Sequence, residues 1–134
     1  MLDYLATLPY ADRSRVLVTG VSHGGWTALA LGALHPRGVK GLVNFAGGLR
    51  QEGCVAWENT LARAAGSYGR RTEVPSLWLY GDNDTFFSPP TFTAMYRAYT
   101  AGGARQKLVD YGEFGNDAHM LFALRRAARS GSRR

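Results

Sequence analysis

Short apolar runs alternate with helix-like stretches along the chain. Four runs are rich in β-branched or aromatic residues and are bounded by Gly, Pro or Asp, a pattern typical of strands. They cover residues 16–19, 39–45, 76–80 and 106–111. The third run, SLWLY, is apolar without a break, which predicts a strand buried on both faces of a parallel sheet.

Helix-like stretches fill most of the gaps between these runs. They cover residues 2–8, 26–34, 59–65, 91–99 and 120–128. We expect Pro36 to end the second near His35, Gly66 and Gly69 to follow the third, and prolines to open the fourth. Strands that alternate with helices predict an α/β fold: a parallel sheet of about four strands with flanking helices and right-handed crossovers. Sites in such sheets lie at the carboxyl ends of the strands.

A G-x-S-x-G motif, Gly20-Val21-Ser22-His23-Gly24, lies between the first strand-like run and a helix-like stretch. In this motif a serine is held on a tight strand-to-helix turn, and we expect Gly20 and Gly24 to avoid collisions there. Gly25 is expected to let the helix pack closely on the sheet. A chain with 17 glycines matches the bare pattern by chance about one time in ten. The interpretation as a nucleophile turn therefore depends on the position of the motif between a strand-like and a helix-like segment. The competing interpretation is a Gly-rich turn with an incidental serine.

A serine nucleophile needs a histidine base and a carboxylate that orients it. Of the three histidines, His23 adjoins the serine and His35 lies at a helix end, so His119, in the loop after the last strand, is the best-placed base. Asp82 and Asp84, in the turn after SLWLY, are close candidates for the acid.

Two further aspartates are weaker candidates for the acid. Asp110 lies within the last strand and Asp117 directly beside the histidine. The order Ser, Asp, His differs from that of the chymotrypsin and subtilisin families.

The segments GVSHGGW, LVNFAGG, LWLYGDNDTFF and FGNDAHMLF resemble the α/β-hydrolase family, in its dienelactone-hydrolase-like and acylaminoacyl-peptidase-like branch. The resemblance covers about residues 17–122. It implies that Ser22 attacks an ester or amide carbonyl, that His119 moves the proton and that Asp84 is the acid. Asp82 is then expected to bond the turn backbone. The resemblance also implies that the backbone N–H of His23 is one oxyanion donor and that the second comes from a segment upstream of Ser22.

By the same resemblance the chain corresponds to strands five to eight of the family core. We therefore expect residues 1–128 to form a partial α/β-hydrolase domain from a truncated reading frame, with weak activity, and residues 129–134 to form a basic disordered tail. The first strand would be an unprotected edge, which a longer parent protein or a second copy in a homodimer would cover.

Composition narrows the function further. Hydrophobic residues make up 46% of the chain and charged residues 19%, which indicates a folded domain. The net charge of +6 owes much to arginines near the C-terminus, without aromatic residues for base stacking, so we expect no nucleic-acid or membrane partner. The single cysteine, Cys54, and the lack of ligand spacing predict no metal and no cofactor. The sequence does not determine the cellular compartment. We take the cytoplasm as the default, and export is possible if a preceding segment is missing.

The predicted function is a serine hydrolase that cleaves a small-molecule carboxylic ester. A serine peptidase of the acylaminoacyl or prolyl-oligopeptidase type and a non-catalytic fragment are the alternatives. Trp26, Trp57, Phe86 and Phe87 are candidates for lining a substrate pocket, although core positions suit them as well. Residues 48–58 form a long connection above the strand ends, where substrate-contacting segments lie in this fold.

Overall fold

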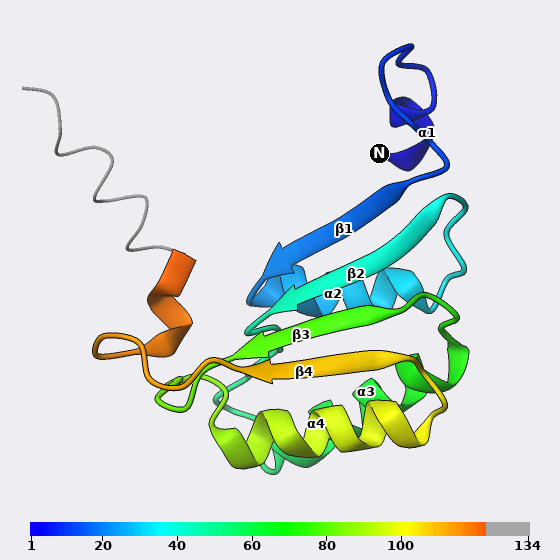
Figure 1. The fold of residues 1–134 in the computed structure, drawn as a ribbon. Coiled ribbons are helices and arrows are strands. Elements are labelled where there is room, and N and C mark those ends of the chain that lie inside the picture. The colour runs from blue at the N-terminus through cyan, green and yellow to red at the C-terminus, as the bar shows by residue number, and fades with distance from the viewer. Residues whose placement is uncertain (123–134) are drawn as a thin grey trace, which may run out of the picture.

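A four-stranded parallel sheet runs through the protein in the order β1-β2-β3-β4 (Figure 1). The computed structural model describes residues 1–122 of the chain. The strands are β1 (Val16–Val21), β2 (Val39–Phe45), β3 (Ser76–Tyr80) and β4 (Gln106–Asp110). Since every neighbouring pair is parallel, the four carboxyl ends lie at one edge of the sheet. The predicted fold class is confirmed.

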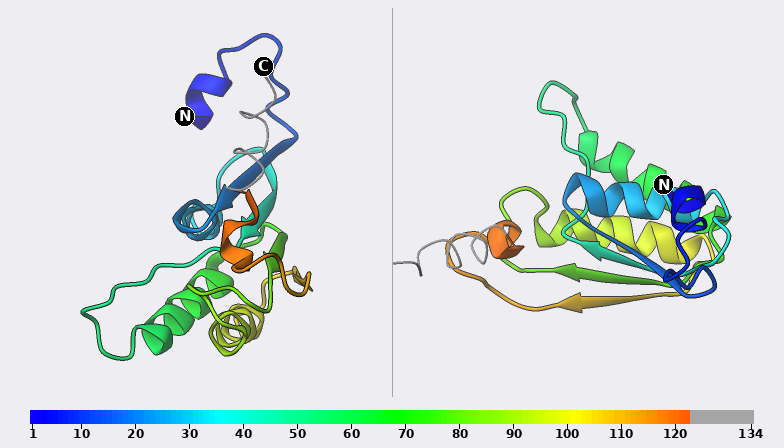
Figure 2. Two further views of the ribbon diagram at one scale, coloured as in Figure 1. Left: turned by 90° about the vertical axis from the view of Figure 1, so that its left-hand side faces the viewer. Right: turned by 90° about the horizontal axis from the view of Figure 1, so that it is seen from above.

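Helices cover one face of this sheet (Figure 2). The helical elements are α1 (Leu2–Leu5), α2 (His23–Gly32), α3 (Trp57–Arg71), α4 (Pro89–Ala101) and the 3₁₀ helix η1 (Ala118–Met120). α2, α3 and α4 each connect two consecutive strands. Right-handed crossovers that step in one direction across a sheet leave their helices on the same face, so the strand order accounts for this arrangement.

The core lies between the sheet and the three connecting helices. Trp78 and Tyr80 of β3 are fully buried there, together with Leu29 of α2 and Tyr99 of α4. Leu77 and Leu79 point to the opposite face and are only half-buried. The expectation that this strand is buried on both faces is therefore wrong for the described residues, because no described helix covers the second face.

β1 is the edge strand and lacks a partner on its outer side within residues 1–122. Leu17 on this strand is 67% exposed. Burial alternates along β1, so its inward-facing residues still pack on the core while the others face solvent. The predicted open edge is present in the described part of the chain.

The boundaries of β2 and β3 match the prediction to the residue, and α4 and β4 match within about two residues. β1 runs two residues further than predicted, to Val21, and α2 begins earlier, at His23. α1 ends sooner, at Leu5. Residues 123–128 of the predicted closing helix and the predicted tail, residues 129–134, lie outside the described residues.

The length of α3 differs most from the prediction. It spans fifteen residues, whereas the sequence predicts a short helix that ends before Gly66. Gly66 and Gly69 are instead buried inside the helix, where it packs on α4. A Cβ atom on Gly69 would overlap the backbone carbonyl of Tyr99. These glycines therefore allow two helices to approach closely instead of ending one. Within the described residues, no helix has the length and apolarity to cross a membrane.

Candidate active site

Ser22 occupies the turn between β1 and α2, with φ 54° and ψ −123°. A positive φ is uncommon for a residue with a side chain, so neighbouring groups must hold this conformation. The end of β2 and the segment that follows it do so: the Ser22 N–H donates to the carbonyl of Phe45 at 2.8 Å, and the Gly48 N–H donates to the Ser22 carbonyl at 3.3 Å. The turn lifts the Ser22 hydroxyl above the carboxyl edge of the sheet.

The glycines around Ser22 differ in what they allow. A Cβ atom on Gly20 would overlap the backbone of Gly24, and one on Gly25 would overlap the amide oxygen of Asn44. Gly24 has open space at the same position within the described residues. The prediction that both flanking glycines avoid collisions is thus correct for Gly20 and wrong for Gly24, while Gly25 packs closely as expected.

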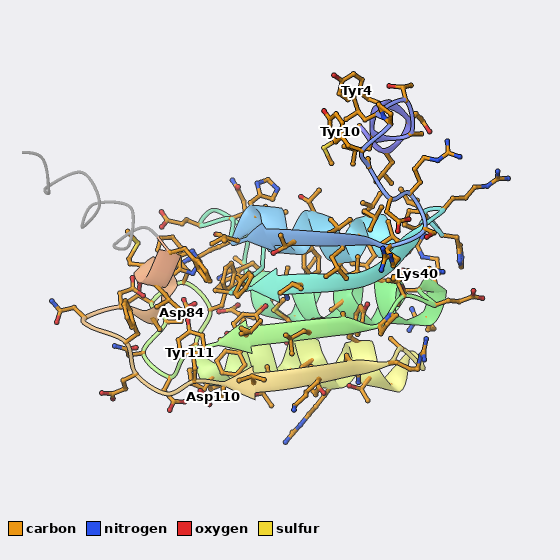
Figure 3. All side chains as sticks on the ribbon, turned by 45° about the horizontal axis from the view of Figure 1, so that its top comes forward. Tyr4, Tyr10, Lys40, Asp84, Asp110 and Tyr111 are labelled. Atoms are coloured by element: carbon orange, nitrogen blue, oxygen red, sulfur yellow. The ribbon has the colours of Figure 1, made fainter. Side chains whose placement is uncertain are left out.

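A continuous chain of contacts joins Ser22, His119 and Asp84. The Ser22 Oγ lies 2.9 Å from Nε2 of His119, and Nδ1 of that ring lies 3.1 Å from Oδ2 of Asp84. Asp84 is buried at the carboxyl end of the strands (Figure 3). With the proton on Nδ1, the imidazole donates to Asp84 and accepts from the serine hydroxyl. This arrangement can take a proton from the serine while a carboxylate stabilises the imidazolium that forms.

The second oxygen of Asp84 is also bonded. Oδ1 accepts from the backbone N–H groups of Phe86 and Phe87, each at 2.8 Å. A carboxylate held by three donors keeps one orientation, so Oδ2 stays directed at His119.

Asp82 does not take part in this chain. Its N–H donates to the Gly112 carbonyl at 3.0 Å, and its side chain is exposed beside Asp110 at the end of β4. The hydrogen bond to the Asp110 carboxyl group and the negative charge of that group raise the pKa of Asp82. The expected bond between Asp82 and the turn backbone is instead made by Asp84.

The remaining candidates lie apart from the imidazole nitrogens. Asp117 bonds the backbone N–H of His119, at 2.9 Å, and not its ring. Neither His23 nor His35 makes a side-chain hydrogen bond to Ser22 in the described chain.

The backbone N–H of His23 is the first of α2, and N–H groups of a first turn have no partner within their own helix.

Two aromatic rings cover the imidazole. The ring of Phe86 stacks on His119 with centroids 4.4 Å apart, and Phe87 lies tilted at 5.7 Å. The His119 side chain is 8% exposed. The rings restrict the access of water to the imidazole.

A hollow of about 350 Å³ opens beside Ser22. Its lining comprises Ser22, His23, Gly48, Leu49, Arg50, Glu52, Phe86 and Phe87. Phe86 and Phe87 therefore line this hollow, and their contact with a substrate stays a prediction. A second hollow, of about 550 Å³, lies near α1 and the start of β1, away from these residues.

The two tryptophans lie elsewhere. Trp26 is 7% exposed and packs in the core against Tyr68, so it does not line the hollow. Trp57 does not line the hollow but packs edge-to-face on Phe87, which does, with ring centroids 6.2 Å apart. Arg50, which the sequence analysis does not single out, has its guanidinium 5.7 Å from the Trp57 ring. The sequence feature that could have indicated Arg50 is the long connection after β2, in which it lies.

Comparison with known proteins gives consistent results. The family model described as "Dienelactone hydrolase family" matches residues 1–128. A putative dienelactone hydrolase from Klebsiella pneumoniae has a similar structure, with a TM-score of 0.71 and 25% identity over 97% of this chain and 53% of that chain. An acylaminoacyl peptidase has a TM-score of 0.64 and 16% identity, over 90% of this chain and 22% of that chain.

A dienelactone hydrolase-like promiscuous phosphotriesterase from metagenomic libraries has a TM-score of 0.61 and 23% identity, over 84% of this chain and 41% of that chain. The chain thus spans about half the length of the Klebsiella protein, at 53%, and a smaller share of the other two. No curated protein matches it.

Proposed function

The chain belongs to the dienelactone hydrolase family, and we propose that it is a serine hydrolase that cleaves a carboxylic ester through an acyl-enzyme on Ser22. The observation that carries the proposal is the contact of Ser22 Oγ with Nε2 of His119 at 2.9 Å, continued by Asp84 at 3.1 Å. A serine hydroxyl is a weak nucleophile at neutral pH, and such a pair of contacts is what activates it.

The reaction begins with attack of Ser22 Oγ on the ester carbonyl while Nε2 of His119 takes the hydroxyl proton. Asp84 holds the Nδ1 proton and offsets the positive charge on the ring. His119 then gives its proton to the departing alcohol, and a water molecule activated by the same imidazole releases the acid. Phe86 and Phe87 form the apolar wall of the hollow in which the acyl group lies.

The tetrahedral intermediate carries a negative oxygen that needs N–H donors. The backbone N–H of His23, at the positive end of α2, is one. By family resemblance the second belongs to a segment that precedes β1. Loss of one such donor costs about 10² to 10³ in rate, so we expect the 134-residue chain alone to hydrolyse esters slowly.

Peptide-bond cleavage is the second candidate. It is considered because the fold is similar to that of an acylaminoacyl peptidase, at 16% identity. The family membership favours the ester. Comparison of a p-nitrophenyl ester with an N-acyl-alanine p-nitroanilide separates the two, and we expect hydrolysis of the ester only.

A fluorophosphonate probe tests the proposal directly, because it reacts with activated serines. We expect labelling at Ser22, together with slow p-nitrophenyl butyrate hydrolysis, and loss of both in Ser22→Ala. Ser67→Ala, on α3 away from the hollow, is the matched control and should keep both. Hydrolysis that survives in Ser22→Ala would refute the nucleophile, and a folded protein that never labels would indicate a non-catalytic fragment.

A further inference from the structure

The acid and the base of the proposed triad stand on different loops. Asp84 belongs to the loop between β3 and α4, residues 81–88, called the acid loop here. His119 lies in η1, at the end of the segment that follows β4; residues 111–119 are called the histidine loop here. A single bond between two loops fixes their separation poorly, since each loop can move with its own side chain. The alignment of Asp84 with His119 therefore needs other links between the loops.

Asp117 supplies the most direct link. Its Oδ2 accepts from the Thr85 hydroxyl at 2.7 Å, and its Oδ1 accepts from the Thr85 backbone N–H at 3.1 Å. The same Oδ1 accepts from the backbone N–H of His119 at 2.9 Å. One carboxylate thus joins the residue that follows Asp84 to the backbone of His119.

Asn83, on the other side of Asp84, makes a second link. Its side-chain amide donates to the Gly115 carbonyl at 3.0 Å and accepts from the Phe114 N–H at 3.0 Å. Residues on both sides of Asp84 are therefore bonded to the histidine loop. Bonds to Asn83 are neutral, whereas those to Asp117 are charge-assisted and stronger.

The charge state of Asp117 agrees with this role. Burial acts to raise the pKa of Asp117, but the hydrogen bonds from Thr85 and His119 outweigh it and hold the pKa below the ordinary value. The carboxylate is ionised at neutral pH and can accept all three bonds at once.

We propose that Asp117 is a positioning residue for the triad, holding Thr85 and the His119 backbone in a fixed relation so that Asp84 stays aligned with the imidazole. The inference rests on the proposed function of Ser22, Asp84 and His119. Asp117 makes no hydrogen bond to the reacting serine or to an imidazole nitrogen, so it positions the triad through Thr85 and the His119 backbone.

The test compares Thr85→Val, which removes the hydroxyl and keeps the shape, with Thr85→Ser, which keeps the hydroxyl. We expect Thr85→Val to lower kcat about tenfold and Asp117→Ala about 10²-fold, with KM changed by less than about twofold, since misalignment affects the chemical step and not the hollow. Thr85→Ser should restore kcat to within about twofold of the parent chain. Thr100→Val is the matched control, because its hydroxyl also makes hydrogen bonds but lies on α4 away from the triad.

A spectroscopic readout makes the test independent of turnover. The Nδ1 proton of His119, bonded to a carboxylate, should give a sharp downfield proton resonance in the parent chain, Thr85→Ser and Thr100→Val. It should broaden in Thr85→Val and Asp117→Ala. An unchanged kcat and an unchanged resonance in a folded Asp117→Ala variant would overturn the inference. Absence of Ser22-dependent hydrolysis in the parent chain would overturn the proposed function instead, and the resonance would still decide the role of Asp117.

Discussion

Oδ2 of Asp84 lies 3.1 Å from Nδ1 of His119, while Asp82, two residues earlier, turns its carboxylate toward Asp110. Alternate residues of one turn thus face different groups, and only one of these carboxylates can orient the imidazole. Sequence spacing alone does not separate them, since both follow the same strand.

Asp84→Asn is expected to lower kcat between about 10²-fold and 10⁴-fold. The amide oxygen can still accept from the Phe86 and Phe87 N–H groups, so the loop should keep its shape. The amide nitrogen, however, is a donor and would force the imidazole into the wrong tautomer. Steady-state hydrolysis of a p-nitrophenyl ester measures the effect.

Asp82→Asn is the matched control, and its kcat should stay within about twofold of the parent value. The change removes a negative charge beside that of Asp110, and the amide N–H of an asparagine can still donate to the Asp110 carboxylate. A larger loss of activity in Asp82→Asn than in Asp84→Asn would reverse the assignment of the acid.

Gly20 and Gly24 should respond to alanine in opposite directions. A Cβ atom at Gly20 meets backbone atoms of Gly24 and Gly25, which have no flexible end to move aside. Gly20→Ala should therefore destabilise the fold by about 1–3 kcal/mol and displace Ser22. Gly24 lies in the first turn of α2 with open space, so Gly24→Ala should stabilise by up to about 1 kcal/mol, since alanine favours helix more than glycine does.

Urea unfolding of the two glycine variants beside the parent chain measures both effects. Equal losses in the two variants would show that the turn tolerates neither side chain, and equal tolerance would show that Gly20 is not confined.

Local signals were enough to predict part of the fold and of the site. β2 and β3 are mainly apolar runs followed by small residues, Ala46 and Gly81, and their bounds follow from sequence alone. The motif around Ser22 and the loop positions of Asp84 and His119 predicted residues at one edge of the sheet, and the three side chains do lie in contact. Their catalytic roles are the proposal made above.

Long-range contacts account for what could not be predicted. Gly66 and Gly69 indicate a helix end locally, but the approach of α4 makes them interior positions of α3. Thr85 and Asp117 are 32 residues apart, and nothing near either residue reveals that their loops meet. The half-burial of Leu77 depends on what covers the second face of the sheet, which local sequence does not encode.

Tyr80→Phe should cost about 1–3 kcal/mol of folding free energy, because it leaves buried polar groups without partners. The Tyr80 hydroxyl is fully buried, donates to the Gly47 carbonyl at 2.5 Å and accepts from the Asn44 side-chain amide at 3.1 Å. These bonds fix the segment after β2 that also holds the backbone of Ser22. Urea unfolding with an unchanged m-value would measure the loss.

Tyr68→Phe is the control for Tyr80. Its ring is half-buried against Trp26, and its hydroxyl makes no hydrogen bond to a described residue, so the change should stay within about 0.5 kcal/mol. Equal stabilities of the two variants would mean that the Tyr80 hydroxyl contributes nothing net.

The contribution of Asp117 to stability should depend on pH in the acid range. Burial acts to raise its pKa, yet the bonds from Thr85 and His119 and the charge of His119 hold the folded-state pKa below the ordinary value of 3.8. A carboxyl group with a lowered pKa stabilises the fold fully above its unfolded pKa, and this stabilisation is lost as the pH falls through the folded value. The titratable groups that face it are His119 and Tyr111, both in the histidine loop. Burial, with the charges of Asp84, Asp110 and Asp117, raises the pKa of Tyr111.

The measurement is urea unfolding of the parent chain and Asp117→Asn from about pH 7 to about pH 3. The stability difference should be largest near neutral pH and shrink as the pH falls below the unfolded value. It should stay under about 1 kcal/mol, because solvent screens this partly exposed side chain. In a Thr85→Val background the hydroxyl that donates to Asp117 Oδ2 is absent, so the same substitution should give a smaller pH-dependent difference. A difference that is constant over the whole range would contradict the ionised, three-bond state of Asp117 on which its link between the acid and histidine loops depends.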